Sequence, residues 1–381
     1  MTADLEPIRT KLAALGRPHT SADVADAMRA EGLLVSDAAL LETVEAIRRE
    51  SVGAGPLDPL LRLEGVTDVL VNGPDQVFLD RGKGLEDAGV RFSSDAEVRR
   101  LAQRLAASAG RRLDDSSPFV DTRLADGTRV HAVLGPLADP GTCISLRVGS
   151  RRVLSLDDLI AAGTVPPAGA QVLTAMVMAR VAYLISGGTG SGKTTLLAAL
   201  LALVPPAERL VIVEDSRELA PRHPHVVRLE GRPGNAERTG AVTLTDLVRQ
   251  ALRMRPDRLV VGEVRGAEIC DLLAAMNTGH EGGCGTVHAN SAADVPARLE
   301  ALAAIGGLPR EALHAQLSSA LDVLVHIRRD QSGRRRVSEI SVLDRDPVGG
   351  LVTAMPAVGF AGGRVTTGPG AAELERILSR S

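Results

Sequence analysis

The sequence predicts an α/β protein with a large domain on a parallel sheet, preceded by a smaller α/β domain and a helical N-terminal extension. The apolar runs "AYLISGG", "RLVIVED" and "RLVVGEV" predict the sheet, because they alternate with helical patterns as buried parallel strands do. A glycine-rich segment between the first run and an apolar helix predicts a phosphate-binding loop. Together, these observations indicate a doubly wound nucleotide-binding fold.

The composition is that of a globular chain of two or three domains. It has 381 residues, of which 44% are hydrophobic. Aromatic residues make up 1% and the formal net charge is −3, so base stacking and a strongly basic surface are both disfavoured, and no direct nucleic-acid partner is expected. Three cysteines form no CxxC pair, and no signal peptide or membrane-spanning run is recognisable. We therefore expect a soluble, cytoplasmic protein.

The N-terminal half divides into two parts. Residues 1–52 show helical apolar spacing in "VADAMRAEGLL" and "ALLETVEAIRRE" and end at the glycine- and proline-rich "VGAGPLDPL". Residues 53–150 are predicted to form a small α/β domain. Its helix is "DAEVRRLAQRLAASAG", and its strands are "TDVLVNG", "QVFLDR", "TRVHAVLG" and "CISLRVG".

The C-terminal half divides at residue 345. Residues 151–345 are the predicted nucleotide-binding domain, which opens with a helix capped by Ser155. It closes with a hairpin in "LVHIRRDQSGRRRVSEISVL", whose arginines are either a nucleic-acid patch or, as we favour, a solvated turn. Residues 346–381 are rich in Gly, Ala and Pro, and we predict a variable, poorly ordered tail.

The segment "GGTGSGKTT" matches the phosphate-loop pattern G-x-x-x-x-G-K-[ST]. Its glycines let backbone N–H groups surround phosphate oxygens, and the following helix adds its positive dipole end. We expect Lys193 to reach the β- and γ-phosphates and the Thr194 hydroxyl to bind Mg²⁺. The predicted nucleotide-binding residues are Gly187, Gly188, Thr189, Gly190, Ser191, Gly192, Lys193, Thr194 and Thr195.

Acidic residues follow the next two predicted strands, at the edge of the sheet where ligands bind. "VEDSREL" supplies Glu214, Asp215 and Glu218, and "VVGEVRG" supplies Glu263. We predict that Glu263 polarises the water that attacks the γ-phosphate, with Glu214 as the second candidate. The alternative for Glu263 is a helix-capping or salt-bridged surface residue. No guanine-reading NKxD motif follows, which disfavours a GTPase.

A third feature is "TGHEGGCGTVHAN", in which His280, Cys284 and His288 are spaced four residues apart. On a helix this spacing would suit zinc, and a cysteine nucleophile with its histidine is a second possibility. The four glycines disfavour a helix, so we predict a loop in which the spacing carries little information.

These motifs stand in the order of the secretion ATPase superfamily, which the chain resembles. "GGTGSGKTT", "VEDSREL", "LRMRPDRLVVGEVRG" and "TGHEGGCGTVHANS" resemble its Walker A, Asp box, atypical Walker B and His box. Residues 53–345 are covered, and "GPLDPLLRLEGVTDVLVNG" is most similar to the tight-adherence (Flp pilus) and conjugal transfer branch. One departure is "GGCGT", where many relatives carry "GSLST".

The resemblance implies a RecA-like ATPase domain that binds ATP and Mg²⁺ and works as a homohexamer. It implies a protein peripherally associated with the inner face of the cell membrane, where an inner-membrane platform protein of a pilus or secretion system is its partner. Rival interpretations are a RecA-like DNA-translocating motor or helicase, and a nucleotide-dependent scaffold without turnover.

The resemblance also implies roles for individual residues. His288 senses the γ-phosphate, and His280 orders its loop. Arg129 and Arg147 reach the nucleotide from the same or a neighbouring subunit. The further arginines considered are Arg123 in the small domain, and Arg253 and Arg255 as subunit contacts.

Overall fold

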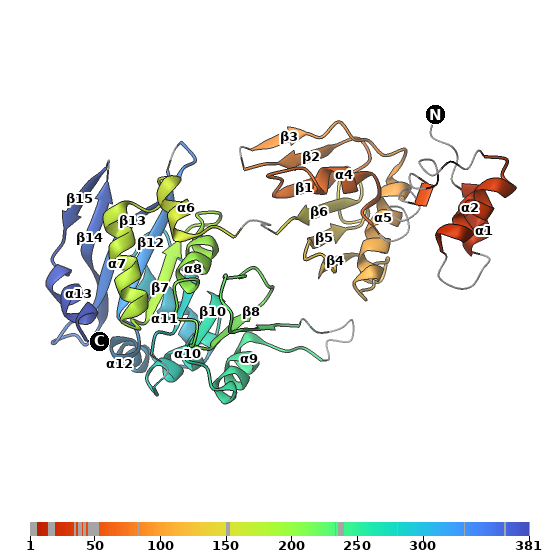
Figure 1. The fold of residues 1–381 in the computed structure, drawn as a ribbon. Coiled ribbons are helices and arrows are strands. Elements are labelled where there is room, and N and C mark those ends of the chain that lie inside the picture. Colours follow the sequence, from red (N-terminus) through yellow and green to blue (C-terminus); the bar gives the residue numbers. More distant parts are fainter. Residues whose placement is uncertain are drawn as a thin grey trace. The chain divides into compact units, whose positions relative to one another are not determined.

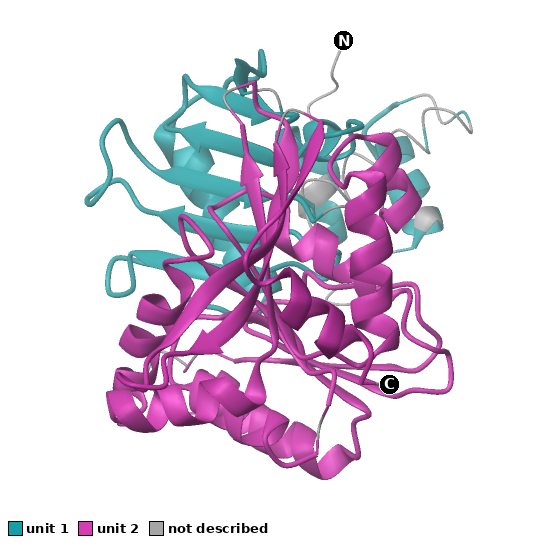
Figure 2. Cartoon of the chain, turned by 90° about the vertical axis from the view of Figure 1, so that its left-hand side faces the viewer, with its two compact units in different colours: residues 1–149 teal, residues 150–381 magenta. Residues whose placement is uncertain are grey.

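The computed structural model divides into two compact units, residues 1–149 and 150–381 (Figure 2). We describe each unit by itself, and the division into parts at residues 52, 150 and 345 stays a prediction. The structure describes residues 6–13, 20–33, 36, 40, 43–44, 53–82, 84–149, 153–232, 234, 240–279, 281–330, 332–361 and 363–380.

The first unit begins with two short helices, α1 (Glu6–Ala13) and α2 (Ser21–Ala30). Ile8 and Met28 are buried in the small core between them. The Thr20 side chain caps α2 and is bonded in turn to Asp23. The helical pattern predicted in "ALLETVEAIRRE" lies largely outside the described residues.

A six-stranded antiparallel sheet forms the rest of this unit, in the order β3-β2-β1-β6-β5-β4 (Figure 1). The short helices η1 (Gly55–Leu57) and α4 (Asp58–Leu61) precede it, and α5 (Asp95–Ser108) packs on its apolar face. All four predicted strands and the predicted helix are present. The strands are β1 (Asp68–Asn72), β2 (Val77–Asp80), β3 (Leu85–Asp87), β4 (Phe119–Arg123), β5 (Arg129–Val133) and β6 (Cys143–Arg147).

The second unit is built on a nine-stranded sheet in the order β15-β14-β13-β12-β7-β11-β10-β8-β9. The six strands from β12 to β9 run parallel, and β13, β14 and β15 extend the sheet in antiparallel fashion. The strands are β7 (Tyr183–Gly187), β8 (Leu210–Glu214), β9 (Val226–Glu230), β10 (Arg258–Val264), β11 (Cys284–His288), β12 (Val323–Arg329), β13 (Arg335–Arg345), β14 (Val352–Ala361) and β15 (Arg364–Thr367).

Helices cover both faces of this sheet (Figure 1). One core lies under α6 (Leu156–Ala161), α7 (Pro167–Met178), α8 (Lys193–Leu201) and α13 (Ala371–Leu378). The other lies under α9 (Leu244–Ala251), α10 (Glu268–Met276), α11 (Val295–Ile305) and α12 (Arg310–Ala320). Strands β7, β8 and β10 are buried on both faces, as their continuous apolar runs predict. Within the described residues, none of the helices has the length and apolarity needed to cross a bilayer.

The prediction of a poorly ordered tail is wrong. Residues 352–378 form β14, β15 and α13, and β14 pairs with β13 of the main sheet through seven residue pairs. Leu374 and Ile377 are buried in the core. The composition of the tail is a poor guide here, because its Gly and Pro residues lie at turns and at a register shift. The apolar residues between them pair with a sheet that the rest of the domain supplies.

Candidate active site

The phosphate loop joins β7 to α8 at the carboxyl edge of the parallel strands. Gly190 and Gly192 have φ of 69° and 100°, which L side chains seldom adopt. Gly187 is required for a different reason, since a Cβ there would lie 2.2 Å from the Ile327 carbonyl oxygen. The loop therefore has the backbone shape that turns consecutive N–H groups toward a phosphate.

Lys193 is buried in this loop, with 7% of its surface exposed. Its Nζ donates to the carbonyl oxygens of Gly187 and Gly188, each at 3.0 Å, and lies 3.4 Å from both ring nitrogens of His288. Burial lowers the pKa of Lys193, and the nearby Glu263 carboxylate opposes that shift. The sequence placed Lys193 and His288 ninety-five residues apart, and the sheet brings them into contact because β7 and β11 are parallel neighbours.

Glu263 lies next to these two residues, on the other side of His288. Its Oε1 is 2.6 Å from His288 Nε2, and its Oε2 accepts a hydrogen bond from Arg265 Nη2. The pairing of β10 with β11 changes register from Val261 to Val264. Glu263 lies in this irregular part of the strand, where the direction of a side chain departs from the regular alternation. The Thr286 hydroxyl, buried between the strands, fixes the same point by donating to the Gly262 carbonyl oxygen at 2.7 Å.

The electrostatics keep His288 neutral near pH 7. Burial lowers its pKa, the charge of Lys193 lowers it further, and Glu263 opposes both. A neutral ring has one nitrogen free to accept a hydrogen bond, which suits the neighbouring Lys193 ammonium. Glu263 Oε2 is bonded to Arg265, whereas Oε1 is buried beside His288 and has no hydrogen-bond partner among the described residues.

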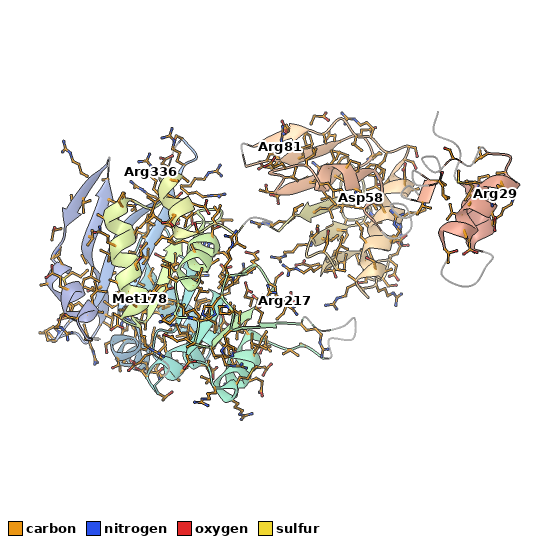
Figure 3. The ribbon with its side chains drawn as sticks, in the orientation of Figure 1. Arg29, Asp58, Arg81, Met178, Arg217 and Arg336 are labelled. Atoms are coloured by element: carbon orange, nitrogen blue, oxygen red, sulfur yellow. The ribbon has the colours of Figure 1, made fainter. Side chains whose placement is uncertain are left out.

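Glu214 is buried beneath this cluster, with 4% of its surface exposed. Its Oε1 accepts hydrogen bonds from the backbone N–H groups of Glu218 and Leu219, each at 3.0 Å. A Cβ at Gly262 would lie 2.5 Å from Glu214 Cγ, so the carboxylate is packed against β10. Glu214 therefore has a structural role, since it holds the loop of residues 215–219. Arg217 of that loop, which is labelled in Figure 3, pairs with Glu230.

Part of the "TGHEGGCGTVHAN" stretch forms a strand. The prediction of a loop throughout is wrong for Cys284–His288, which form β11. Cys284 and His288 therefore stand at opposite ends of a strand, about 13 Å apart at 3.3 Å per residue. Burial raises the pKa of Cys284 to about 11, so its thiol is protonated at neutral pH and is a poor nucleophile and metal ligand. His280 lies outside the described residues, among which no three His, Cys, Asp or Glu side chains group as a metal site.

In the first unit, the structure brings three predicted arginines into one row. Arg123 is directly opposite Arg129, and Arg129 is directly opposite Arg147, on three adjacent antiparallel strands. Directly opposed residues share a face of the sheet. The alternating Val130 and Leu146 are buried, so the arginines lie on the face away from that core.

Sequence reasoning missed three residues of this neighbourhood. Arg265 is part of the motif "LRMRPDRLVVGEVRG", but the motif alone assigns it no role. Its position two residues after Glu263 is the signal that could have suggested a contact between the two side chains. His326 on β12 bonds Ser186, and Arg335 on β13 bonds the phosphate loop. No sequence signal connects these two with the loop. Arg253 and Arg255 are exposed around the short helix η2 (Leu252–Met254), where Arg255 has φ of 53°.

Comparison with known proteins assigns the chain to a family. The family model described as type II/IV secretion system protein matches residues 50–354. The chain belongs to this family. It is a P-loop ATPase of the secretion type, and the predicted resemblance to secretion ATPases is confirmed.

Individual relatives agree with this assignment. A putative conjugal transfer protein of Mycobacterium tuberculosis is 57% identical over 316 residues, covering 81% of this secretion ATPase and 90% of the relative. The type IV secretion system protein PtlH of Bordetella pertussis is 34% identical over 320 residues, with 76% and 94% coverage. The solved structure of the Legionella pneumophila ATPase DotB has a TM-score of 0.53 at 21% identity, covering 73% of this chain and 77% of that one. The likeness to DotB supports the predicted fold, a RecA-like P-loop domain with a smaller α/β domain before it.

The residues of the phosphate loop fit a nucleoside triphosphate. Ser191 is 2% exposed, and its hydroxyl has no hydrogen-bond partner among the described residues. Lys193 opens α8, so its ammonium, the loop N–H groups and the helix dipole combine at one point. Thr194 follows Lys193 in the first turn of α8, the place from which a hydroxyl can bind Mg²⁺.

Proposed function

We propose that this secretion ATPase hydrolyses ATP to power pilus assembly or secretion, with Glu263 as general base. The observation that carries the proposal is the cluster of Lys193, His288 and Glu263 beside the phosphate loop. Each side chain contacts the next, and the cluster joins the start of α8, which follows β7, to β11 and β10. These three strands converge on the edge of the sheet where doubly wound folds bind nucleotides.

The chain's own residues have separate tasks in this proposal. Lys193 leaves the carbonyl oxygens of Gly187 and Gly188 and turns its ammonium toward the β- and γ-phosphates. Glu263, whose Oε1 has no hydrogen-bond partner among the described residues, accepts the proton of the attacking water. Bound Mg²⁺, held through Thr194, would neutralise charge on the phosphate oxygens.

His288 has the part of a sensor. Its neutral ring lies between the residue that binds phosphate and the residue that activates water. A γ-phosphate oxygen would draw Lys193 away from the ring or bind a ring nitrogen itself, and either change moves the ring that lies against Glu263 Oε1. The sensing role is thus one hydrogen bond exchanged for another. Glu214 remains the second candidate base, although its two backbone hydrogen bonds favour a structural task.

We further propose a cytoplasmic homohexamer, peripherally associated with the inner face of the cell membrane. Its partner would be an inner-membrane platform protein of a pilus, secretion or conjugal transfer system. Residues 53–150 and 151–345 would be the two domains that close on ATP and reopen on release. The relatives named for conjugal transfer and type IV secretion support this setting.

Three variants test the chemistry. Glu263→Gln keeps the size of the side chain and removes its basicity, so it should bind ATP and turn over about 10²-fold more slowly. Lys193→Ala should weaken ATP binding itself, because a phosphate-contacting charge is lost. Glu214→Gln is the comparison for the second candidate base. Near-normal hydrolysis by Glu263→Gln, measured in single turnover, would transfer the role to another group.

The DNA-translocating motor is the second function, and DNA addition distinguishes the two. With a net charge of −3 and 1% aromatic residues, we expect the ATPase rate to be unchanged by single- or double-stranded DNA at moderate salt. Stimulation of several-fold that declines steeply as salt rises would favour the motor. Poly-aspartate is the control for a general polyanion effect.

A further inference from the structure

The hairpin of β12 and β13 lies against the phosphate loop on the side away from His288. In the sheet, β12 and β11 flank β7 on its two sides. Of the two neighbours of the loop, this hairpin is the one that contains none of the four family motifs. Arg336, which stands near the start of β13, marks this hairpin in Figure 3.

The hairpin contacts the base of the loop through two residues of β12. His326 Nδ1 is 2.9 Å from the Ser186 hydroxyl, and both side chains are buried. His326 also bonds the backbone of Asn290, two residues after His288. Next to it, the Ile327 carbonyl oxygen occupies the space that a side chain at Gly187 would need.

A third contact reaches the tip of the loop. Arg335 Nε donates to the Gly190 carbonyl oxygen at 3.1 Å. The Cδ of the same side chain lies 3.2 Å from where a Cβ at Gly192 would be. Gly190 and Gly192 are the two loop residues with left-handed backbone, so Arg335 contacts the loop where its conformation is least favoured for other residues.

We infer that Arg335 is a positioning residue for nucleotide binding, which holds the phosphate loop in its binding shape from outside. A hydrogen bond to the Gly190 carbonyl fixes the peptide plane whose N–H belongs to Ser191, and in this structure that N–H donates to the Gly188 carbonyl oxygen at 3.3 Å. Arg335 thus holds the turn of the loop from the other end of this peptide, and the shape of the turn decides which N–H groups can reach a phosphate oxygen. A loop fixed before the nucleotide arrives loses less conformational entropy on binding, and affinity rises accordingly.

The chain offers a matched control for this role. Arg334 precedes Arg335 on the same hairpin, is exposed, and carries the same charge. In an extended segment its side chain points to the opposite face. Arg334→Ala therefore removes one positive charge from the hairpin without removing the contact with Gly190. Arg335→Lys is the conservative variant, since its ammonium can still donate to that carbonyl.

The inference rests on the proposed function, and the experiment separates the two. ADP with Mg²⁺ is titrated calorimetrically into the full chain and into the three variants. We expect Arg335→Ala to raise the Kd about three- to tenfold, the range for one lost hydrogen bond of ordinary net strength. Arg334→Ala should stay within about twofold of wild type, and Arg335→Lys should recover most of the loss.

A second readout needs no nucleotide. Hydrogen–deuterium exchange of the peptide spanning residues 183–197 should be faster in Arg335→Ala than in wild type and unchanged in Arg334→Ala. Equal Kd and equal exchange in wild type and Arg335→Ala would overturn the inference, as would an equal loss of affinity in Arg334→Ala. Failure of the wild-type chain itself to bind ADP or ATP would instead refute the proposed function.

Discussion

At the scale of single residues, the site is organised around shared hydrogen bonds. Lys193, His288 and Glu263 form a continuous line of contacts, and Arg265 closes it at the far oxygen of Glu263. Each group is therefore held by a neighbour that also takes part in the proposed chemistry. Such coupling makes the effects of single substitutions non-additive, and His288 at the centre is the most informative position.

His288→Ala is expected to separate binding from turnover. The phosphate loop and Lys193 remain, so ATP should still bind with an affinity near that of wild type. Turnover should fall about 10- to 100-fold, because Glu263 loses the partner that orients it. Fluorescent nucleotide titration and single-turnover hydrolysis measure the two separately. Elemental analysis is the control: about one zinc per chain, lost in the variant, would restore the metal interpretation of "TGHEGGCGTVHAN".

His326 predicts a pH dependence of stability. Burial lowers its pKa, and Glu339 and the Asn290 backbone only partly oppose this. When the pKa of a histidine is lower in the folded chain than its ordinary value of 6.5, the unfolded chain binds the proton more tightly. The free energy of unfolding therefore decreases as the pH falls below 6.5. Thermal unfolding at pH 7.5 and 5.5 should therefore show a larger decrease for wild type than for His326→Gln. Equal decreases in both proteins would contradict this assignment.

At the scale of elements, the second unit is stabilised by helices that the sheet positions. The Ser155 side chain caps α6 as predicted and forms a capping box with Asp158. The hairpin predicted around "DQSG" is also confirmed, since β12 and β13 pair in antiparallel register. In contrast, α13 lies in a segment whose composition predicted no order.

The role of α13 is tested by its buried face. Ile377 is 4% exposed in the core shared with α7 and α8, so Ile377→Ala should reduce the free energy of unfolding by about 2–5 kcal/mol. Glu375→Ala on the exposed side of the same helix is the control and should change it by less than about 0.5 kcal/mol. Urea unfolding measures both. A loss below about 1 kcal/mol for Ile377→Ala would show that α13 contributes little to the core.

At the scale of the whole molecule, the first unit contributes a row of arginines on its sheet. The row of Arg123, Arg129 and Arg147 lies on the face of its sheet away from the core, and continues on β1 to Asp68, which is directly opposite Arg147. Asp121 pairs with Arg129 at 3.7 Å, a distance at which an exposed pair contributes little. The prediction that these arginines reach a nucleotide is best tested at Arg147, the exposed member of the row.

Arg147→Ala is the corresponding prediction. If this arginine reaches the γ-phosphate in the assembled ATPase, turnover should fall about 10-fold or more while nucleotide affinity and thermal unfolding change little. Arg81→Ala removes an equal charge from the same unit at an exposed position paired with Glu86 (Figure 3). If the Arg147 and Arg81 variants hydrolyse ATP at the same rate, Arg147 has no catalytic role. That role then belongs to Arg129 or to no arginine of β5 and β6.

The parallel sheet, the phosphate loop and the four motifs at its edge can be predicted from the sequence, because each depends on a short local pattern. Continuous apolar runs indicate burial on both faces, and the glycines of residues 187–192 indicate backbone conformations that other residues avoid. Which residues meet depends on the packing of the whole sheet and cannot be predicted from any local pattern. Lys193 and His288 touch because β7 and β11 are neighbours, and Arg335 reaches Gly190 from 145 residues away along β13. The tail became ordered for the same reason, since its strands are completed by pairing with β13 and its helix by a core supplied from elsewhere in the chain.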